Sequence, residues 1–136
     1  MGKVKLKKDT YVQKNQTIPW DYIIYAICLD NDVEVGRIVF RYGTNEQLKY
    51  CGHIGYHIDE IYRGHGYAYQ GLCLLMPLLY DEGFRQLRIS VAYHNIASQK
   101  TVEKLPIITK YLDQDVQDAE YQVEDGLWIY EIEVNK

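Results

Sequence analysis

The sequence predicts an α/β protein built on a central mixed sheet, and three observations support this prediction. Three strand-like segments at 3–13, 21–29 and 33–42 open the chain, and the second and third form a hairpin around a turn at 30–32. A strand, a glycine turn, a helix and a further strand follow over residues 48–93. Fourteen tyrosines favour sheet-rich structure with broad amphipathic surfaces.

The fourth and fifth strands are predicted to be parallel, because a helix connects them. The fourth strand covers 48–58 and carries apolar or small residues on both faces, as in a strand covered on both sides. The helix covers 66–82 and ends at Gly83, while Pro77 inside it predicts a kink. The fifth strand covers 87–93, so the unit forms a right-handed crossover.

The rest of the chain adds a second helix and further strands. Asn95 is predicted to cap this helix, and Pro106 ends it. The segments predicted after the helix are a short strand at 107–111, an acidic loop at 113–118 and a hairpin at 120–134 that turns near Asp125-Gly126.

Composition indicates a single domain over residues 1–136, with the apolar content of 47% that is usual in globular proteins. The formal net charge of −4 provides no overall basic field for nucleic acid. No apolar run approaches the ~20 residues of a membrane span. Three cysteines lie in apolar or glycine-rich runs, which favours buried thiols over a disulfide framework. We therefore expect a cytoplasmic protein with no nucleic-acid partner and no membrane partner.

The clearest chemistry lies in a turn with the sequence Arg63-Gly64-His65-Gly66-Tyr67-Ala68. Two glycines one residue apart permit a tight bend and leave backbone N–H groups uncovered. The helix that starts here adds unpaired N–H groups and the positive end of its dipole, which favour a phosphate or pyrophosphate. A Rossmann fingerprint is excluded because Tyr69 replaces its third glycine, and a P-loop is excluded because no Gly-Lys-Ser/Thr occurs.

Two motifs together resemble the GNAT (GCN5-related N-acetyltransferase) family. The first is Arg-x-x-Gly-x-Ala before a helix, here Arg63, Gly66 and Ala68, and the second is an asparagine that opens the next helix, here Asn95. The sequence is most similar to the ribosomal-protein N-terminal acetyltransferase branch. That branch favours Tyr-Arg-Gly-x-Gly-Tyr-Ala and Asn-x-x-Ser-x-x-x-Val-x-Glu-Lys-Leu, and the resemblance covers residues 51–105 well.

The resemblance implies a GNAT-like acyl-CoA N-acyltransferase fold with splayed strands four and five, and acetyl-CoA as co-substrate without a metal. The glycine turn is expected to bind the pyrophosphate, and the fourth strand's backbone is expected to pair with the pantetheine arm like an added strand. One of its N–H groups can also steady the oxyanion. The expected CoA-binding residues are Tyr56, His57, Ile58, Arg63, Gly64, His65, Gly66, Tyr67, Ala68, Tyr69, Asn95 and Ser98.

The acid and base for amine acetylation are not assigned by the commoner family patterns, because those positions hold Gly52, Ser90 and Val102. The branch that this chain resembles uses the serine of Asn-x-x-Ser as the acid, which corresponds to Ser98. It can also use a glutamate on a late strand, and Glu120 is the nearest match. These two residues are therefore the candidates that the resemblance implies.

Each candidate also has an ordinary structural interpretation. The Ser98 hydroxyl can bond its own helix turn or CoA, and Glu120 can be a solvated charge on an edge strand. His53 can act as a base through a water, or it can be a hydrogen-bonded structural histidine. His53 and His57 lie about 13 Å apart on one extended strand, so a metal site that adds Cys51 is not expected.

The interval between the first two strands is short. Family members usually place two helices there, whereas only residues 13–22 fill it in this chain. This predicts an open acceptor groove, suited to a protein N-terminus or a flexible chain, or completed by a second subunit in a homodimer. Acidic residues between 113 and 125 can attract a cationic acceptor, or they can form a solvated loop.

These observations lead to two functional hypotheses. The first is an acetyl-CoA-dependent N-acetyltransferase in which a primary amine attacks the thioester directly within a ternary complex. Its acceptor can be a protein N-terminus or a small amine such as a polyamine, an antibiotic or an amino acid. The second is a catalytically weak CoA-binding module, which the missing family acid and base favour.

Overall fold

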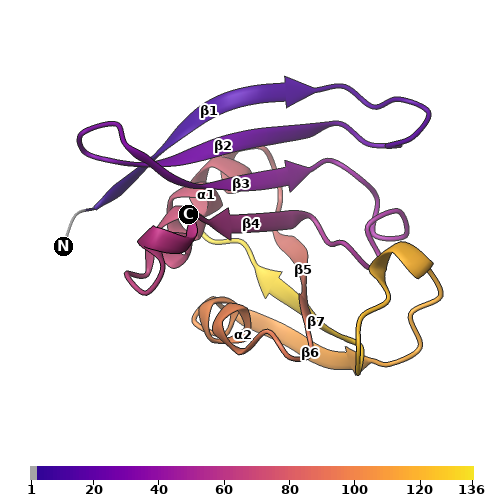
Figure 1. Ribbon diagram of the computed structural model, residues 1–136. Coiled ribbons are helices and arrows are strands. Elements are labelled where there is room, and N and C mark those ends of the chain that lie inside the picture. Colours follow the sequence, from indigo (N-terminus) through magenta and orange to yellow (C-terminus); the bar gives the residue numbers. More distant parts are fainter. Residues whose placement is uncertain (1–2) are drawn as a thin grey trace.

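The computed structural model describes residues 3–136, which form two β-sheets and two α-helices (Figure 1). The strands are β1 (Val4–Val12), β2 (Tyr22–Leu29), β3 (Glu34–Arg41), β4 (Ile54–Ile58), β5 (Gln86–Ala92), β6 (Ile107–Asp113) and β7 (Leu127–Glu133). The helices are α1 (Tyr67–Asp81) and α2 (Ile96–Val102), with the short 3-10 helices η1 (Glu60–Tyr62) and η2 (Ala119–Tyr121). The predicted α/β class is confirmed.

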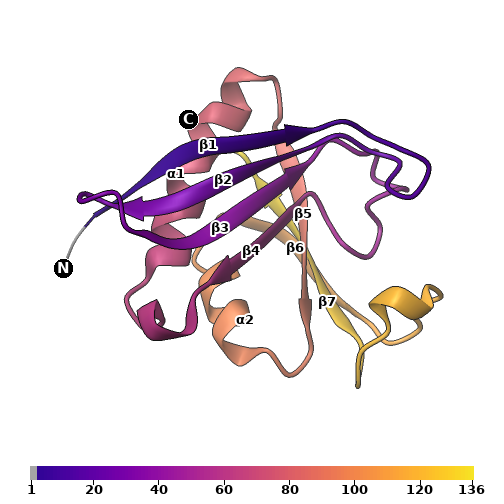
Figure 2. The same cartoon turned by 45° about the horizontal axis from the view of Figure 1, so that its top comes forward.

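The strands divide into two antiparallel sheets, one in the order β1-β2-β3-β4 and the other in the order β5-β7-β6. Within residues 3–136, an isolated bridge between Gly52 and Ile89 connects the sheets. The His53 N–H also donates to the Arg88 carbonyl over 2.8 Å. β4 and β5 then diverge (Figure 2). The predicted splay is confirmed, and the outer edge of β4 has no strand partner among the described residues.

α1 covers the first sheet and contacts all four of its strands. Its buried stripe includes Leu72, Leu75 and Leu79, each fully buried, and their spacing of three and four residues places them on one helix face. Each such leucine contributes about 1.5–3 kcal/mol through burial. Gly71 lets the helix approach closely, because a Cβ there would lie 3.0 Å from Ile38 Cδ1.

Two predicted segments are wrong in the structure, and the fourth strand is the first. It begins at Ile54 rather than at residue 48, and residues 48–51 form turns. Gly52 interrupts the strand because its φ is 73° and a Cβ there would lie 2.7 Å from the Arg88 carbonyl oxygen. This close contact with the start of β5 depends on tertiary structure, so strand-like residue types did not reveal it.

The predicted hairpin at 120–134 is the second error. Its first half is replaced by η2, which begins where the Asp118 side chain accepts a hydrogen bond from the Glu120 N–H over 3.0 Å. Asp125 and Gly126, with φ of 64° and 96°, do form a turn that leads into β7. β7 pairs with β5 and β6 instead of with a neighbour in the chain. Glu120 therefore lies on a 3-10 turn and not on an edge strand.

The signals at the helix ends are confirmed. Gly83 follows α1 with φ of 102°, and Asn95 Oδ1 caps α2 by accepting from the Ser98 N–H over 3.1 Å. α1 continues past Pro77 to Asp81. Residues 13–21 contain no helix, as predicted. Among residues 3–136, every helix is too short or too polar to cross a lipid bilayer.

Candidate acyl-transfer site

The glycine turn provides an open backbone surface at the start of α1. Gly64 and Gly66 have φ of 88° and 75°, and a Cβ at either position would meet nothing within 4 Å. The first helical hydrogen bond runs from the Gln70 N–H to the Gly66 carbonyl, so the N–H groups of residues 67–69 have no acceptor within the helix. Unpaired N–H groups and the positive end of the helix dipole suit an anionic ligand.

The turn is tied to the end of β4. Arg63 Nε donates to the Ile58 carbonyl over 2.9 Å, and the His65 ring stacks on the Tyr67 ring with centroids 5.3 Å apart. Tyr67 and Ala68 are buried where α1 meets the sheet. The structure thus brings the predicted CoA-binding residues of the turn next to those of β4. The unpaired edge of β4 faces the gap between β4 and β5.

A cavity of about 350 Å³ lies in the gap between β4 and β5. Its wall includes Tyr56 from β4, Asn95 and Ser98 from the start of α2, and Glu120 from η2. Residues predicted to act on the cofactor and on the reacting amine therefore surround one space. The divergence of the two strands accounts for this cavity, because no ladder of hydrogen bonds closes it.

The Ser98 hydroxyl has a phenol as its neighbour. Tyr56 OH and Ser98 Oγ are 2.6 Å apart, and either atom can be the donor. Burial raises the pKa of Tyr56, so its phenol stays protonated in the neutral range. The pair forms a short hydroxyl chain at the cavity wall, which can pass a proton outward as well as hold the side chains in place.

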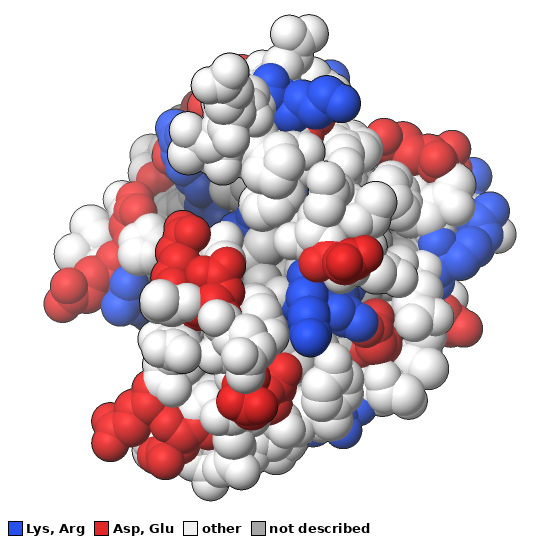
Figure 3. All heavy atoms as spheres, turned by 90° about the vertical axis from the view of Figure 1, so that its right-hand side faces the viewer, with Lys and Arg blue, Asp and Glu red and all other residues white. Residues whose placement is uncertain are grey.

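A second cavity of about 620 Å³ adjoins the first. It lies between the loop that precedes β2 and the η2 segment, and its wall includes Trp20 and Asp118. Three residues line both cavities: Arg41, Glu120 and Tyr121. Figure 3 looks onto this end of the molecule, where acidic side chains gather at several places. The two cavities therefore meet at a wall that carries charges of both signs.

His53 does not join the predicted site. It is 5% exposed, its Nδ1 accepts from the Arg88 N–H over 3.0 Å, and it lines neither cavity. Burial lowers the pKa of its imidazole. These contacts fit a hydrogen-bonded structural histidine and do not support a base role for His53.

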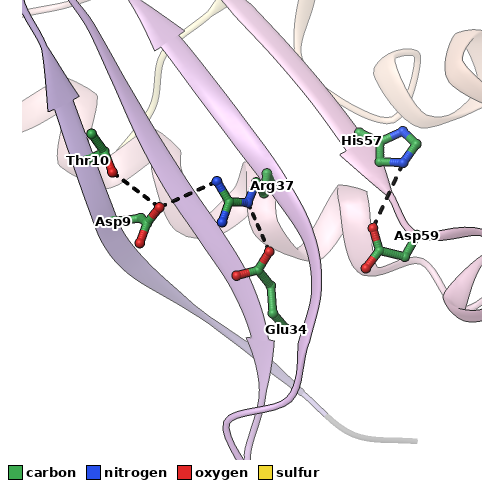
Figure 4. A network of polar contacts seen from close by, with 6 residues as sticks. All are labelled: Asp9, Thr10, Glu34, Arg37, His57 and Asp59. Atoms are coloured by element: carbon green, nitrogen blue, oxygen red, sulfur yellow. Dashed lines mark hydrogen bonds and ion pairs between the residues drawn. The ribbon is translucent and has the colours of Figure 1, made fainter.

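Cys51, His53 and His57 are not among the described side chains that approach one another closely enough to share a metal. Cys51 lines the first cavity and His57 is exposed at the end of β4, where its Nε2 lies 3.9 Å from Asp59 Oδ1 (Figure 4). Among the described residues, three metal-ligating side chains approach one another at His94, Glu124 and Asp125, all of them exposed. That group lies outside the CoA-binding residues and the base candidate.

Sequence reasoning missed Arg41, Tyr121 and the phenol of Tyr56. Arg41 lies near the end of a long antiparallel strand, and Tyr121 follows an acidic segment, so neither has a local motif. Tyr56 was predicted only through its backbone. The sole signal available was composition, since tyrosines are numerous in a chain with few other aromatic residues.

Comparison with known proteins agrees with this geometry. The sequence profile of the Acetyltransferase (GNAT) domain matches residues 6–106. Among solved structures, the RimL ribosomal L7/L12 alpha-N-protein acetyltransferase in complex with coenzyme A has a TM-score of 0.61 at 24% identity, over 83% of this chain and 62% of that one. The Salmonella typhimurium acetyltransferase that modifies the N-terminal serine of L7/L12 gives 0.61 at 23% identity, over 84% and 64%.

A third structure, the microcin C7 self immunity acetyltransferase MccE with acetyl-CoA and AMP, gives a TM-score of 0.62 at 17% identity, over 83% of this chain and 61% of that one. No curated protein matches. The chain spans less than two thirds of the length of these three structures, and at such identities they show the fold. Because the domain profile matches most of the sequence, the chain belongs to the GNAT acetyltransferase domain family.

Proposed function

We propose that the protein is an acetyl-CoA-dependent N-acetyltransferase that transfers an acetyl group to a primary amine within a ternary complex. Membership of the GNAT family supports this proposal. The observation that carries this proposal is the cavity between β4 and β5. It is lined on one side by β4, the strand that precedes the glycine turn, and it meets a second cavity at Glu120. One cavity can hold the thioester and the other the acceptor.

The chain's own groups suit acetyl-CoA. The unpaired N–H groups around Gly64 and Gly66 would hold the pyrophosphate, and the open edge of β4 would pair with the pantetheine amides. An N–H of β4 next to the cavity would stabilise the oxyanion. Two of the solved structures named above contain coenzyme A or acetyl-CoA, which supports the same cofactor here.

The proton transfers follow from the residues at the cavity wall. Glu120 takes a proton from the acceptor ammonium, so that the neutral amine forms the new C–N bond at the thioester carbon. The C–S bond breaks, and Ser98 donates a proton to the departing thiolate. Tyr56, 2.6 Å from Ser98 Oγ, replaces the proton on the serine. The nitrogen of the adduct loses its second proton to solvent, solvent returns a proton to the Tyr56 phenolate, and Glu120 releases its proton to solvent. The products are an N-acetylated amine and CoA thiol.

Two classes of acceptor fit the proposed reaction. The L7/L12 acetyltransferases support a protein N-terminus as one acceptor class, and the open interval at 13–21 leaves space for a chain. A small amine is the other class. A cytoplasmic location, a single domain over 1–136 and a homodimer stay predictions.

Turnover of acetyl-CoA against a panel of primary amines tests the proposal. The panel should include peptides with free N-termini, polyamines and free amino acids, with release of CoA thiol as the readout. We expect thiol release with at least one acceptor. Calorimetric binding of CoA without thiol release for any acceptor would instead support the CoA-binding module, which the glycine at position 52 and the valine at position 102 favour.

Glu120→Gln tests the base. The amide keeps the size of the side chain but cannot accept a proton, so kcat should fall by about 10²-fold or more. Glu124→Gln is the matched control, because Glu124 is exposed nearby and lines neither cavity. Unchanged kcat in Glu120→Gln would remove this residue from the mechanism.

A further inference from the structure

Arg41 is a cation at the shared wall without a carboxylate partner. Its Nη1 donates to the carbonyls of Cys51 and Gly52, each over 3.1 Å. Within residues 3–136, no carboxylate oxygen lies within 4.0 Å of its guanidinium, and its Nε and Nη2 have no acceptor. The three N–H donors on Nε and Nη2 therefore have no protein acceptor among the described residues, next to two cavities.

Arg37 on the same strand is an arginine that does have carboxylate partners. Its Nε lies 2.9 Å from Glu34 Oε2 and its Nη1 lies 3.4 Å from Asp9 Oδ2 (Figure 4). Glu34 lies on β3 itself and Asp9 lies on β1, and both side chains are exposed at the surface. The contrast within β3 indicates that the lack of a partner at Arg41 is a local property of the cavity wall.

Gly55 makes room for the Arg41 side chain. A Cβ at position 55 would lie 2.9 Å from Arg41 Nη2, so any other residue would displace the guanidinium. Gly55 belongs to β4 and lines the first cavity, directly before Tyr56. The free Nη2 therefore lies over the strand that is proposed to receive the thioester.

An anionic side chain shares this wall. Glu120 lines both cavities, as Arg41 does, yet the two groups are not within 4.0 Å of each other. The ammonium and the carboxylate of an α-amino acid are bonded to the same carbon, so one such ligand offers a cation for Glu120 and an anion for Arg41. A guanidinium binds a carboxylate with strong, charge-assisted hydrogen bonds.

The remainder of the second cavity has an apolar part beside the polar side chains of Thr17, Gln47 and Asp118. Its wall includes Ile18, Pro19, Trp20 and Val39, and its volume of about 620 Å³ falls in the range of small-molecule sites. The apolar part of this lining can contact an aliphatic or aromatic side chain, whose burial adds to the affinity.

We propose that the acceptor is a free α-amino acid with a large apolar side chain, held by Arg41 at its carboxylate and by Glu120 at its amine. This inference rests on the proposed acetyltransferase function and narrows its acceptor to one class. A protein N-terminus offers the amine but has a neutral peptide carbonyl in place of the carboxylate. The charge at Arg41 would then discriminate against it.

Three related acceptors test this inference on the unmodified protein: phenylalanine, phenylalaninamide and phenethylamine. All three carry the same ring and a primary amine, but only the first carries a carboxylate. We expect kcat/KM for phenylalanine to exceed that for the other two by roughly tenfold or more, as is usual for charge-assisted hydrogen bonds. In Arg41→Gln this preference should fall by at least about tenfold, whereas in Arg37→Gln it should stay unchanged.

The outcomes separate the two proposals. Equal or better turnover of phenylalaninamide, phenethylamine or a peptide N-terminus would overturn the amino-acid acceptor and leave the acetyltransferase function intact. No thiol release with any amine, peptides and polyamines included, would overturn both. The comparison of acceptors needs no variant, so the inference stays falsifiable even where Arg41→Gln does not fold.

Discussion

The hydroxyl pair of Tyr56 and Ser98 shows how one side chain can change a neighbour's chemistry. Serine alone is a weak acid, and its proton must be replaced after it is given to a thiolate. Tyr56 lies 2.6 Å away, is partly buried, and has a pKa raised by that burial. The phenol therefore stays protonated and can resupply Ser98.

Tyr56→Phe tests this pair. The substitution keeps the ring and its packing but removes the hydroxyl, so we expect kcat for acetyl transfer to fall by roughly tenfold or more while KM for acetyl-CoA changes little. Steady-state kinetics of thiol release give both values. Tyr111→Phe is the control, since Tyr111 is an exposed tyrosine on β6 that lines neither cavity. A matching decrease in both variants would contradict the relay.

At the scale of the single element, α1 has a left-handed glycine at each end. Gly66 precedes the helix with φ of 75°, and Gly83 follows it with φ of 102°. Neither would meet another atom within 4 Å if it carried a Cβ. The loss of stability on substituting either glycine therefore comes from backbone conformation alone. Only Gly66 belongs to the proposed CoA site.

Gly66→Ala and Gly83→Ala should separate folding from binding. Both force a Cβ into the left-handed region, so each should lower the free energy of unfolding by about 1–2 kcal/mol. Only Gly66→Ala should also weaken CoA binding, by roughly tenfold, which equals about 1.4 kcal/mol. Urea denaturation and calorimetry provide the two measurements. Equal loss of CoA affinity in both variants would place the pyrophosphate elsewhere.

The same element shows what local sequence can predict. Gly66, Gly83 and Asn95 act within a few residues of their own positions, and the structure confirms each of them. The start of β4 depends on the contact of Gly52 with the Arg88 carbonyl, 36 positions along the numbering, which no local pattern contains. For the same reason the hairpin around Asp125 was wrong, because β7 finds its partners far away in the chain.

At the scale of the whole molecule, two sheets meet near His53. The His53 N–H donates to the Arg88 carbonyl over 2.8 Å, and its Nδ1 accepts from the Arg88 N–H over 3.0 Å. Beyond this point β4 and β5 separate, and the first cavity lies between them. A buried neutral imidazole thus stands at the base of the gap.

His53 should make stability depend on pH. Burial lowers its pKa in the folded state, so the unfolded protein binds more protons below the ordinary value of about 6.5. The contribution of the neutral His53 to the free energy of unfolding is complete above that pH. It declines as the pH falls, by up to about 1.4 kcal/mol per pH unit. Urea denaturation at a series of pH values from about 7 down to about 5 would measure this change in the free energy of unfolding.

His53→Gln removes the titrating group and should flatten this pH dependence. His57→Gln is the control, because His57 is exposed at the end of β4. An unchanged slope in His53→Gln would assign the pH dependence to other groups. An equal loss of stability at every pH would show only that the contact between the sheets was weakened. The slope of the free energy of unfolding against pH still shows whether His53 is the titrating group.

The candidate site was predictable only in part, and the reason lies in its assembly. The glycine turn and the start of α2 are short contiguous motifs, so the proposed CoA-binding residues could be named from the sequence. The shared wall combines Arg41 of β3 with Glu120 and Tyr121 of η2, which meet only through tertiary structure. The sequence around Arg41 does not predict a binding role, because the absence of a carboxylate partner is apparent only in the folded structure.

The wall of the second cavity also has a consequence for biosynthesis. Residues 17–22 and 118–121 face each other across it, although most of the chain separates them. A nascent polypeptide can expose the first of these segments long before the ribosome has released the second. The second cavity therefore cannot form until synthesis has passed η2, and the proposed acetyl transfer would begin only then.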